Sequence, residues 1–207
     1  MKTVVGIDYS LTSPCVCVSN NNSFSDSYFY FLTDRKFLTG QVLNILGDLH
    51  DNYLTDQQRY ENIASWVLNI LSNLDKSNTD IIIEDYSFGS KGKVFNLAEN
   101  CGLLKYLLYK EGYNFFTVAP SAVKKYATGK GNAGKQQMYD AFYELSQIDL
   151  IWLYAPTTHK LGSPVTDIID SFYLAKYYRN AIAINDMGKL NRGTNKSKSN
   201  VNRPSSS

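Results

Sequence analysis

Three consecutive isoleucines, Ile81 to Ile83, stand between two acidic residues near the middle of the chain. A continuous apolar run of this length is typical of a strand that is buried on both faces of a sheet. Apolar residues recur at helical spacing before this run, from about 56 to 74, and after it, from about 94 to 110. A further strand is expected at 115–118, where Pro120 ends it. Strands and helices that alternate in this way predict a parallel part of a sheet.

The N-terminal third predicts a different kind of strand pairing. Strand-forming residues lie at 3–8, 14–19 and 27–33, with short polar segments between them. Three consecutive strands joined in this way form an antiparallel meander. The C-terminal third is expected to be helical at about 121–128, 135–146 and 167–182. The whole order predicts an α/β fold: a mixed five-stranded sheet, three antiparallel strands followed by two parallel ones, flanked by helices.

The distribution of charge separates a folded part from a tail. The 207 residues fit one domain. Residues 189–207 carry five basic residues and no acid, so with a net charge of +2 for the chain the first 188 residues carry −3. The tail is rich in Ser, Asn and Lys, a composition that favours disorder. We expect a folded domain at 1–188 and a disordered basic tail at 189–207, which either adds non-specific phosphate affinity or has no specific role.

The sequence predicts neither a signal peptide nor a membrane span. Its uncharged apolar stretches are only a few residues long, and an acid, Asp8, follows soon after the N-terminus. The three cysteines, Cys15, Cys17 and Cys101, lack the spacing of a metal or redox motif. A reducing, cytoplasmic location with no membrane partner is therefore predicted.

Four acidic residues stand out by their positions. Asp8 ends the first predicted strand and Glu84 ends the isoleucine strand, which places both at an edge of the sheet. Asp167 and Asp170 open the last predicted helix, where residues three apart share one face. If the first strand and the isoleucine strand are neighbours, all four carboxylates converge.

Converging carboxylates repel one another unless cations lie among them, and hard oxygen ligands suit Mg²⁺ or Mn²⁺. Two such ions about 3.5–4 Å apart clamp the attacking and leaving oxygens of a phosphodiester. The four acids together therefore predict hydrolysis of a nucleic-acid backbone. Taken singly, each acid also fits a structural role, such as Asp167 capping its helix.

These residues resemble motifs of the RuvC-type Holliday-junction resolvases, a group within the RNase H-like nucleases. Gly6-Ile7-Asp8-Tyr9-Ser10 is similar to the opening Gly-Ile-Asp-Pro-Ser/Gly motif, and Ile81-Ile82-Ile83-Glu84 to the second acidic strand. Asp167-Ile168-Ile169-Asp170-Ser171-Phe172 is similar to the final Asp-x-x-Asp-Ala-Leu helix. The segment 120–135 resembles the Val-Lys…Gly-x-Gly-x-Ala-x-Lys region, and the likeness covers roughly 3–183.

The resemblance implies a nuclease of DNA recombination and repair that cuts a four-way junction as a homodimer. It implies that the four acids are catalytic and ligate two Mg²⁺ ions, with Mn²⁺ as a substitute. It further implies that Lys124 and Lys135 contact DNA phosphates or the charge of the transition state. Lys125 and Lys130 are expected to add phosphate contacts. An aromatic residue soon after the second acid stacks at the opened junction in this family, and here the candidates are Tyr86 and Phe88.

Departures from the family pattern leave alternatives open. Tyr9 stands in place of the usual Pro, and residues 34–57 form an insert. Such departures suggest a divergent member from a phage or virus, acting in the host cytoplasm. The alternatives are a general branched-DNA or RNase H-like nuclease and a catalytically silent nucleic-acid-binding protein. The Gly-x₄-Gly-Lys segment 129–135 also matches the start of a phosphate-binding loop, but Gln136 replaces its Ser or Thr, so no nucleotide cofactor is expected. His159 is a candidate for proton transfer or metal binding.

Overall fold

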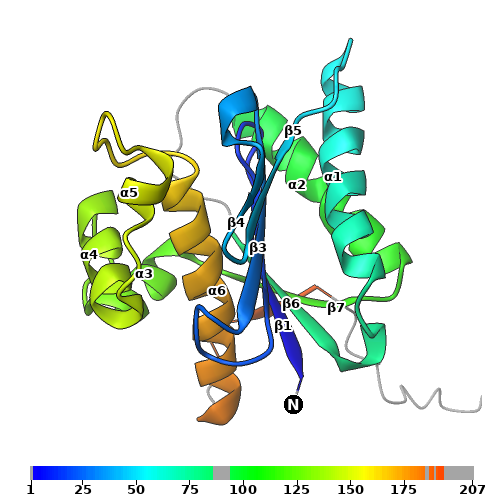
Figure 1. Cartoon of the computed structure of the whole chain (residues 1–207). Helices are drawn as coiled ribbons and strands as arrows, with labels where there is room; N and C mark the ends of the chain where they lie inside the picture. Colours follow the sequence, from blue (N-terminus) through cyan, green and yellow to red (C-terminus); the bar gives the residue numbers. More distant parts are fainter. Residues whose placement is uncertain (1, 86–93, 185–186, 189, 194–207) are drawn as a thin grey trace, which may run out of the picture.

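The computed structural model describes residues 2–85, 94–184, 187–188 and 190–193. Within them a single sheet holds its strands in the order β4-β5-β3-β2-β1-β6-β7-β8 (Figure 1). The strands are β1 (Thr3–Asp8), β2 (Cys15–Ser19), β3 (Ser27–Thr33), β4 (Gly40–Val42), β5 (Ile45–Leu49), β6 (Thr79–Glu84), β7 (Asn114–Val118) and β8 (Asn191–Arg192). The α-helices are α1 (Asp56–Ser72), α2 (Val94–Lys110), α3 (Pro120–Thr128), α4 (Lys135–Ser146), α5 (Leu150–Tyr154) and α6 (Val165–Ala183). Two short 3₁₀ helices are η1 (Lys36–Leu38) and η2 (Lys76–Asn78).

The predicted mixed sheet is confirmed. β1, β2 and β3 pair in antiparallel fashion, as the short polar connections predict. β1 also pairs in parallel with β6, and β6 pairs in parallel with β7. β1 therefore lies between the two halves of the sheet, with the isoleucine strand β6 directly beside it.

The predicted count of five strands is too low. The insert at 34–57 contributes β4 and β5, and β5 runs parallel to β3 and extends the sheet beyond it. Gly47 allows this pairing because a Cβ atom there would lie 2.3 Å from the carbonyl oxygen of Leu38 and 2.6 Å from the ring of Phe31. The prediction also missed α5, a five-residue helix whose first turn is capped by Asp149, which accepts a hydrogen bond from the backbone N–H of Trp152 at 2.8 Å.

The last strand, β8, lies in the segment that was expected to be a disordered tail. It pairs with the free edge of β7 in antiparallel fashion. Arg192 holds it there, since its Nη2 donates to Asn114 Oδ1 at 3.3 Å and its guanidinium lies over the Phe116 ring. Gly193 N–H then donates to the Phe115 carbonyl at 3.0 Å. The described residues 190–193 therefore lie past the predicted boundary at 188, while 189 and 194–207 are outside the described residues.

Helices cover both faces of the sheet, as a strand buried on two sides requires. Figure 1 shows α1 and α2 on one face, and α6 with α3, α4 and α5 on the other. The residues of β1 and β6 alternate between two cores: Val5, Ile7, Ile81 and Ile83 pack with α1 and α2, while Val4 and Ile82 pack with α6. None of the described helices has the length and apolar character that a membrane crossing needs.

Candidate active site

The position of helix α6 depends on a glycine in β1. A Cβ atom on Gly6 would lie 2.2 Å from the carbonyl oxygen of Ser171 and 2.7 Å from the amide nitrogen of Ala175. Both are backbone atoms of α6, so the helix rests directly on β1 where no side chain intervenes. Because side chains alternate along a strand, Asp8 points to the same face as Gly6. The contact therefore fixes the N-terminal turns of α6 beside the end of β1.

The two strand-end acids lie on neighbouring parallel strands. Ile7 of β1 is paired in register with Ile83 of β6, so Asp8 and Glu84 occupy the next position on each strand. Glu84 follows the alternation of β6 and shares a face with Ile82, whose side chain packs in the core under α6. Both carboxylates are therefore at the carboxyl ends of central strands and on the side of the sheet that α6 covers.

The two helix acids lie at the start of α6. The N-cap position is Pro164, and no side chain caps the helix, so Asp167 does not serve as its cap. Thr166 Oγ1 donates to Asp167 Oδ1 at 3.4 Å, whereas Asp167 Oδ2 is buried without a hydrogen-bond partner. A buried carboxylate oxygen without a hydrogen-bond partner is the kind of group that binds a cation or a polar group of the substrate.

The four carboxylates act on one another electrostatically. Burial raises the pKa of Asp8 well above its ordinary value, and Glu84, Asp170 and Asp167 raise it further by charge repulsion. Burial and then Asp170 raise the pKa of Glu84 to about 7. Burial and then Asp167 raise the pKa of Asp170 to about 6. The four predicted acids, which come from three segments, thus lie near enough to repel one another, and together they are called the acid cluster.

Two of the predicted lysines belong to the same cluster. Lys135, the first residue of α4, lowers the pKa of Asp8, and Lys124 of α3 lowers the pKa of Glu84; both lysines act on Asp170. Lys125 lies instead beside a separate hollow together with Tyr126 and Tyr177.

The other predicted site residues lie elsewhere or are not described. Lys130 is exposed in the loop between α3 and α4. His159 acts electrostatically on Asp149, at the start of α5, and not on the acid cluster. Tyr86 and Phe88 fall outside the described residues.

The donor set fits a divalent cation. All four groups are carboxylates, the hard oxygen ligands that Mg²⁺ and Mn²⁺ prefer, and burial together with mutual repulsion disfavours their charged forms. A cation bound among them would stabilise the charged carboxylates and so offset the cost of their burial and repulsion. In the described part of the chain, no three Asp, Glu, His or Cys side chains already stand close enough to hold a metal ion together.

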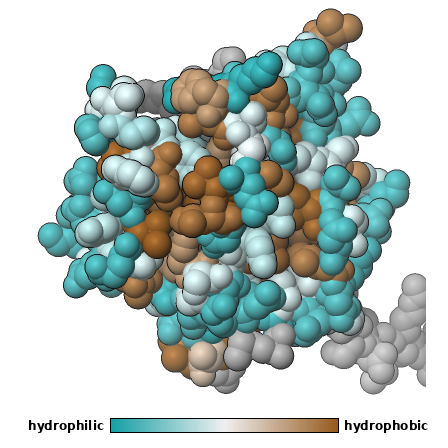
Figure 2. Space-filling model, in the orientation of Figure 1, coloured by the Kyte–Doolittle hydropathy of each residue, from teal (hydrophilic) through white to brown (hydrophobic). Residues whose placement is uncertain are grey.

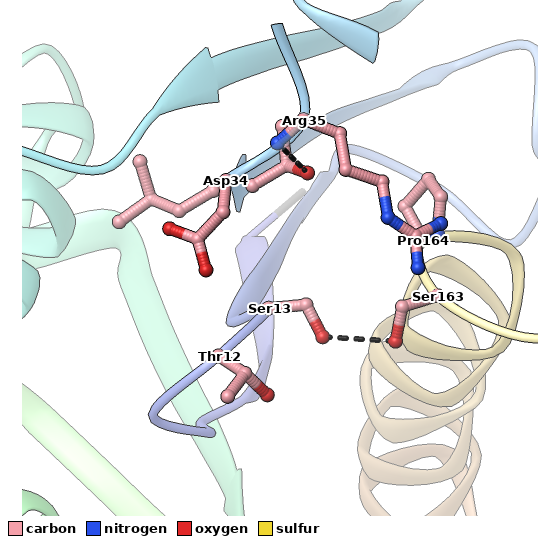
Figure 3. Close-up of a pocket in the computed structure, with 8 residues that line it drawn as sticks. Thr12, Ser13, Asp34, Arg35, Ser163 and Pro164 are labelled. Atoms are coloured by element: carbon pink, nitrogen blue, oxygen red, sulfur yellow. Dashed lines mark hydrogen bonds between the residues drawn. The ribbon is translucent and has the colours of Figure 1, made fainter.

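Sequence reasoning missed two serines that support Asp167. The hydroxyls of Ser163 and Ser13 lower the pKa of Asp167 and so oppose the larger effect of burial. They also lie 2.9 Å apart and share a hydrogen bond (Figure 3). The loop that carries Ser13 is held by Arg59 of α1, whose Nη2 donates to the Leu11 carbonyl at 2.7 Å. The only signal in the sequence is that each serine stands within five residues of a predicted acid.

The fold is similar to that of RuvC from Thermus thermophilus. One RuvC structure matches with a TM-score of 0.59 and 15% sequence identity, over 92% of this chain and 99% of RuvC. A structure of T. thermophilus RuvC in complex with a Holliday junction substrate matches with a TM-score of 0.60 and 15% identity, over 93% and 99%. The yeast mitochondrial Holliday junction resolvase Ydc2 has a TM-score of 0.47 and 16% identity, over 87% and 83%. Neither a protein-family model nor a curated protein matches the sequence. The predicted RuvC-type, RNase H-like fold is confirmed; a phage or viral origin stays a prediction.

Proposed function

We propose that this protein is a Mg²⁺-dependent endonuclease that resolves four-way or branched DNA by hydrolysis of phosphodiester bonds. One observation carries the proposal: on the fold of RuvC, four carboxylates and two lysines near the ends of the central strands act on one another electrostatically. A RuvC with this fold has been solved with a Holliday junction substrate, which supports a DNA junction as the substrate here. We further propose that the protein acts in the cytoplasm as a homodimer, because a four-way junction presents two equivalent strands to be cut.

In this mechanism Asp8, Glu84, Asp167 and Asp170 would hold two Mg²⁺ ions, with Mn²⁺ as a substitute. The ions, when bound, supply Lewis acidity that favours ionisation of the attacking water and offsets charge on the phosphate. The water oxygen forms a new bond to phosphorus as the bond from phosphorus to the leaving oxygen breaks. Without metal, burial and repulsion raise the pKa of Glu84 to about 7 and that of Asp170 to about 6, so binding of the cations would displace protons from these carboxyls. The proton lost by the attacking water and the proton gained by the leaving oxygen are exchanged with solvent.

The lysines have a second role in the proposal. Lys135 lowers the pKa of Asp8 and Asp170, and Lys124 lowers the pKa of Glu84 and Asp170, so we place both cations near the point where the scissile phosphate would meet the acids. A cation fixed there stabilises the negative charge that develops on the phosphate oxygens. Lys125 and Lys130, farther from the acids, would contact phosphates along the DNA strand.

The proposal is tested with a labelled four-way junction, a fork and a linear duplex of matched sequence, each with Mg²⁺ or EDTA. Paired, symmetric cuts in the junction are expected with Mg²⁺ and not with EDTA. Equal cutting of fork and junction would instead establish a general branch nuclease. Binding of the junction without cleavage, in Mg²⁺ and in Mn²⁺, would contradict the enzymatic proposal and favour a silent DNA-binding protein.

The adjacent residues Lys124 and Lys125 offer a matched pair. Lys124→Gln is expected to lower kcat by roughly 10²-fold, because it removes a charge that acts on two of the four acids. Lys125→Gln removes the same charge one residue away, outside the acid cluster, and is expected to raise KM with little change in kcat. Single-turnover cleavage at saturating junction separates the two effects. Equal losses of kcat in both variants would show that Lys124 has no special place at the reacting phosphate.

A further inference from the structure

Two adjoining hollows lie beside the acid cluster. The smaller, about 200 Å³, lies between the loop after β1, the end of β3 and Ser163 (Figure 3). The larger, about 630 Å³, extends from Arg35 and Phe37 to the loop between α5 and α6. Arg35 and Ser163 line both hollows, so the two adjoin, and together they are here named the Arg35 groove. Its larger part falls within the size range of sites that bind small organic ligands, about 300–1,000 Å³.

The Arg35 groove begins at the acid cluster. Ser13 and Ser163, which line the smaller hollow, are the two serines whose hydroxyls act on Asp167. These two serines therefore connect the lining of the groove to an acid that we assign to the metal site. The groove is therefore close enough to the acid cluster to receive a neighbouring part of a DNA strand whose scissile phosphate lies at the acids.

The groove contains an arginine, Arg35, whose guanidinium is free to bind a ligand as far as the described residues are concerned. The guanidinium of Arg35 forms no hydrogen bond or ion pair with any described residue, while its backbone N–H donates to Thr33 Oγ1 at 3.1 Å. Figure 3 shows its side chain extending toward Ser163 and Pro164, whereas the carboxylate of Asp34 lies on the other side of the smaller hollow. The hydroxyls of Ser13 and Ser163 are further polar groups nearby, and an arginine with hydroxyls is a common phosphate-binding set.

The groove also carries an exposed aromatic ring. Phe37 lies two residues after Arg35 in η1 and lines the larger hollow, yet 78% of its surface is exposed. The next residue, Leu38, is buried in the core and fixes this short helix in place. Figure 2, in the orientation of Figure 1, shows apolar side chains gathered across the middle of the molecule. A fixed and exposed ring beside a cation is the arrangement that stacks a base while its phosphate is held.

We propose that the Arg35 groove binds one nucleotide of the DNA strand next to the cleaved bond, with Arg35 on its phosphate and Phe37 against its base. The inference rests on the proposed function, because it places that nucleotide by its distance along the strand from the acid cluster. Lys160, which also lines the larger hollow, adds positive charge where the strand leaves the groove.

Three consecutive residues provide the test and its control. Arg35→Gln and Phe37→Ala are each expected to weaken junction binding about tenfold, measured in EDTA so that no cleavage occurs. In Mg²⁺ the same variants are expected to raise KM with little change in kcat. Lys36→Gln removes a charge from the exposed residue between them, which lines neither hollow, and is expected to bind like the unaltered protein. Equal binding by all three variants and the unaltered protein would overturn the proposal.

Altered substrates locate the nucleotide. Junctions that carry one uncharged methylphosphonate, or one abasic nucleotide, are placed at successive positions around the cut. A methylphosphonate at one position is expected to weaken binding by the unaltered protein about tenfold but not to weaken binding by Arg35→Gln any further. An abasic nucleotide next to that position is expected to weaken binding by the unaltered protein about tenfold but not to weaken binding by Phe37→Ala any further. Additive losses at every position would overturn the assignment.

The two proposals fail in different ways. If the unaltered protein never cleaves but these substrate effects are present in EDTA, the nuclease is disproved and the groove stands. If it cleaves but the effects are absent, the groove alone is disproved. No binding to any of the DNAs would overturn both.

Discussion

Asp8→Asn is expected to remove Mg²⁺-dependent cleavage and, in EDTA, to stabilise the fold. Loss of cleavage should be at least about 10²-fold, because changes even to groups that only support metal ligands cost 10–100-fold. The gain in stability has a separate cause: burial and three neighbouring carboxylates oppose ionisation of Asp8 in the folded state. An uncharged amide of the same shape avoids that cost, so the free energy of unfolding and the Tm should both rise at pH 8.

The pH dependence of this gain follows from the direction of the pKa shift. A carboxyl whose pKa is raised on folding binds its proton more tightly in the folded state than in the unfolded chain. It therefore costs no stability below its unfolded pKa, about 4, and destabilises the fold increasingly as pH rises toward its folded pKa. Glu84 and Asp170, with pKa values of about 7 and about 6, add to the same trend. In EDTA the unaltered protein should lose stability from about pH 4 to pH 7, and the advantage of Asp8→Asn should vanish near pH 4.

The measurement is thermal or urea unfolding in EDTA and in Mg²⁺, from pH 4 to pH 8. Glu61→Gln, a change of an exposed acid on α1, is the control and should shift neither the midpoint nor its pH dependence. Mg²⁺ should stabilise the unaltered protein and Glu61→Gln, but Asp8→Asn much less, because binding to the folded state alone raises stability. If Asp8→Asn were no more stable than Glu61→Gln at pH 8, the acid cluster would not be the strained, cation-requiring group described here.

Much of this site could be predicted because it depends on local positions. An acid that directly follows an apolar strand lies at the sheet edge whatever the rest of the chain does, which placed Asp8 and Glu84. The spacing of Asp167 and Asp170 put both on one helix face. The structure brings these residues together, with Lys124 and Lys135, while their roles as ligands and catalytic groups stay predictions.

What the sequence did not reveal depends on tertiary contacts. β5 contains Gly47 and Asp48, which resemble a loop, and it forms a strand because β3 presents a free edge beside it. β8 has only two polar residues, and its pairing requires the edge of β7. Ser13 and Ser163 are 150 positions apart, so their shared contact at Asp167 exists only after α6 has packed on β1.

That packing leads to the second large effect, since Gly6→Ala is expected to damage both stability and cleavage. The added Cβ would lie 2.2 Å from the Ser171 carbonyl oxygen, and neither backbone can yield as a flexible side chain would. Helix α6 must therefore move away from β1, at a cost of roughly 1–3 kcal/mol, or about 3–10 °C in Tm. The same movement carries Asp167 and Asp170 away from Asp8, and a displacement of about 1 Å at a reacting centre can cost roughly 10²-fold in rate.

Gly102→Ala is the matched control for this prediction. Gly102 lies in α2, is exposed, and has nothing within 4 Å of a Cβ position, so alanine there should be neutral or stabilise the helix by up to about 1 kcal/mol. If α6 alone connects Gly6 to the acids, Gly6→Ala should also require more Mg²⁺ for half-maximal cleavage, a change that simple loss of folded protein does not produce. A Gly6→Ala protein that lost stability but kept the unaltered Mg²⁺ requirement would show that the acid cluster holds its geometry independently of the contact between α6 and β1.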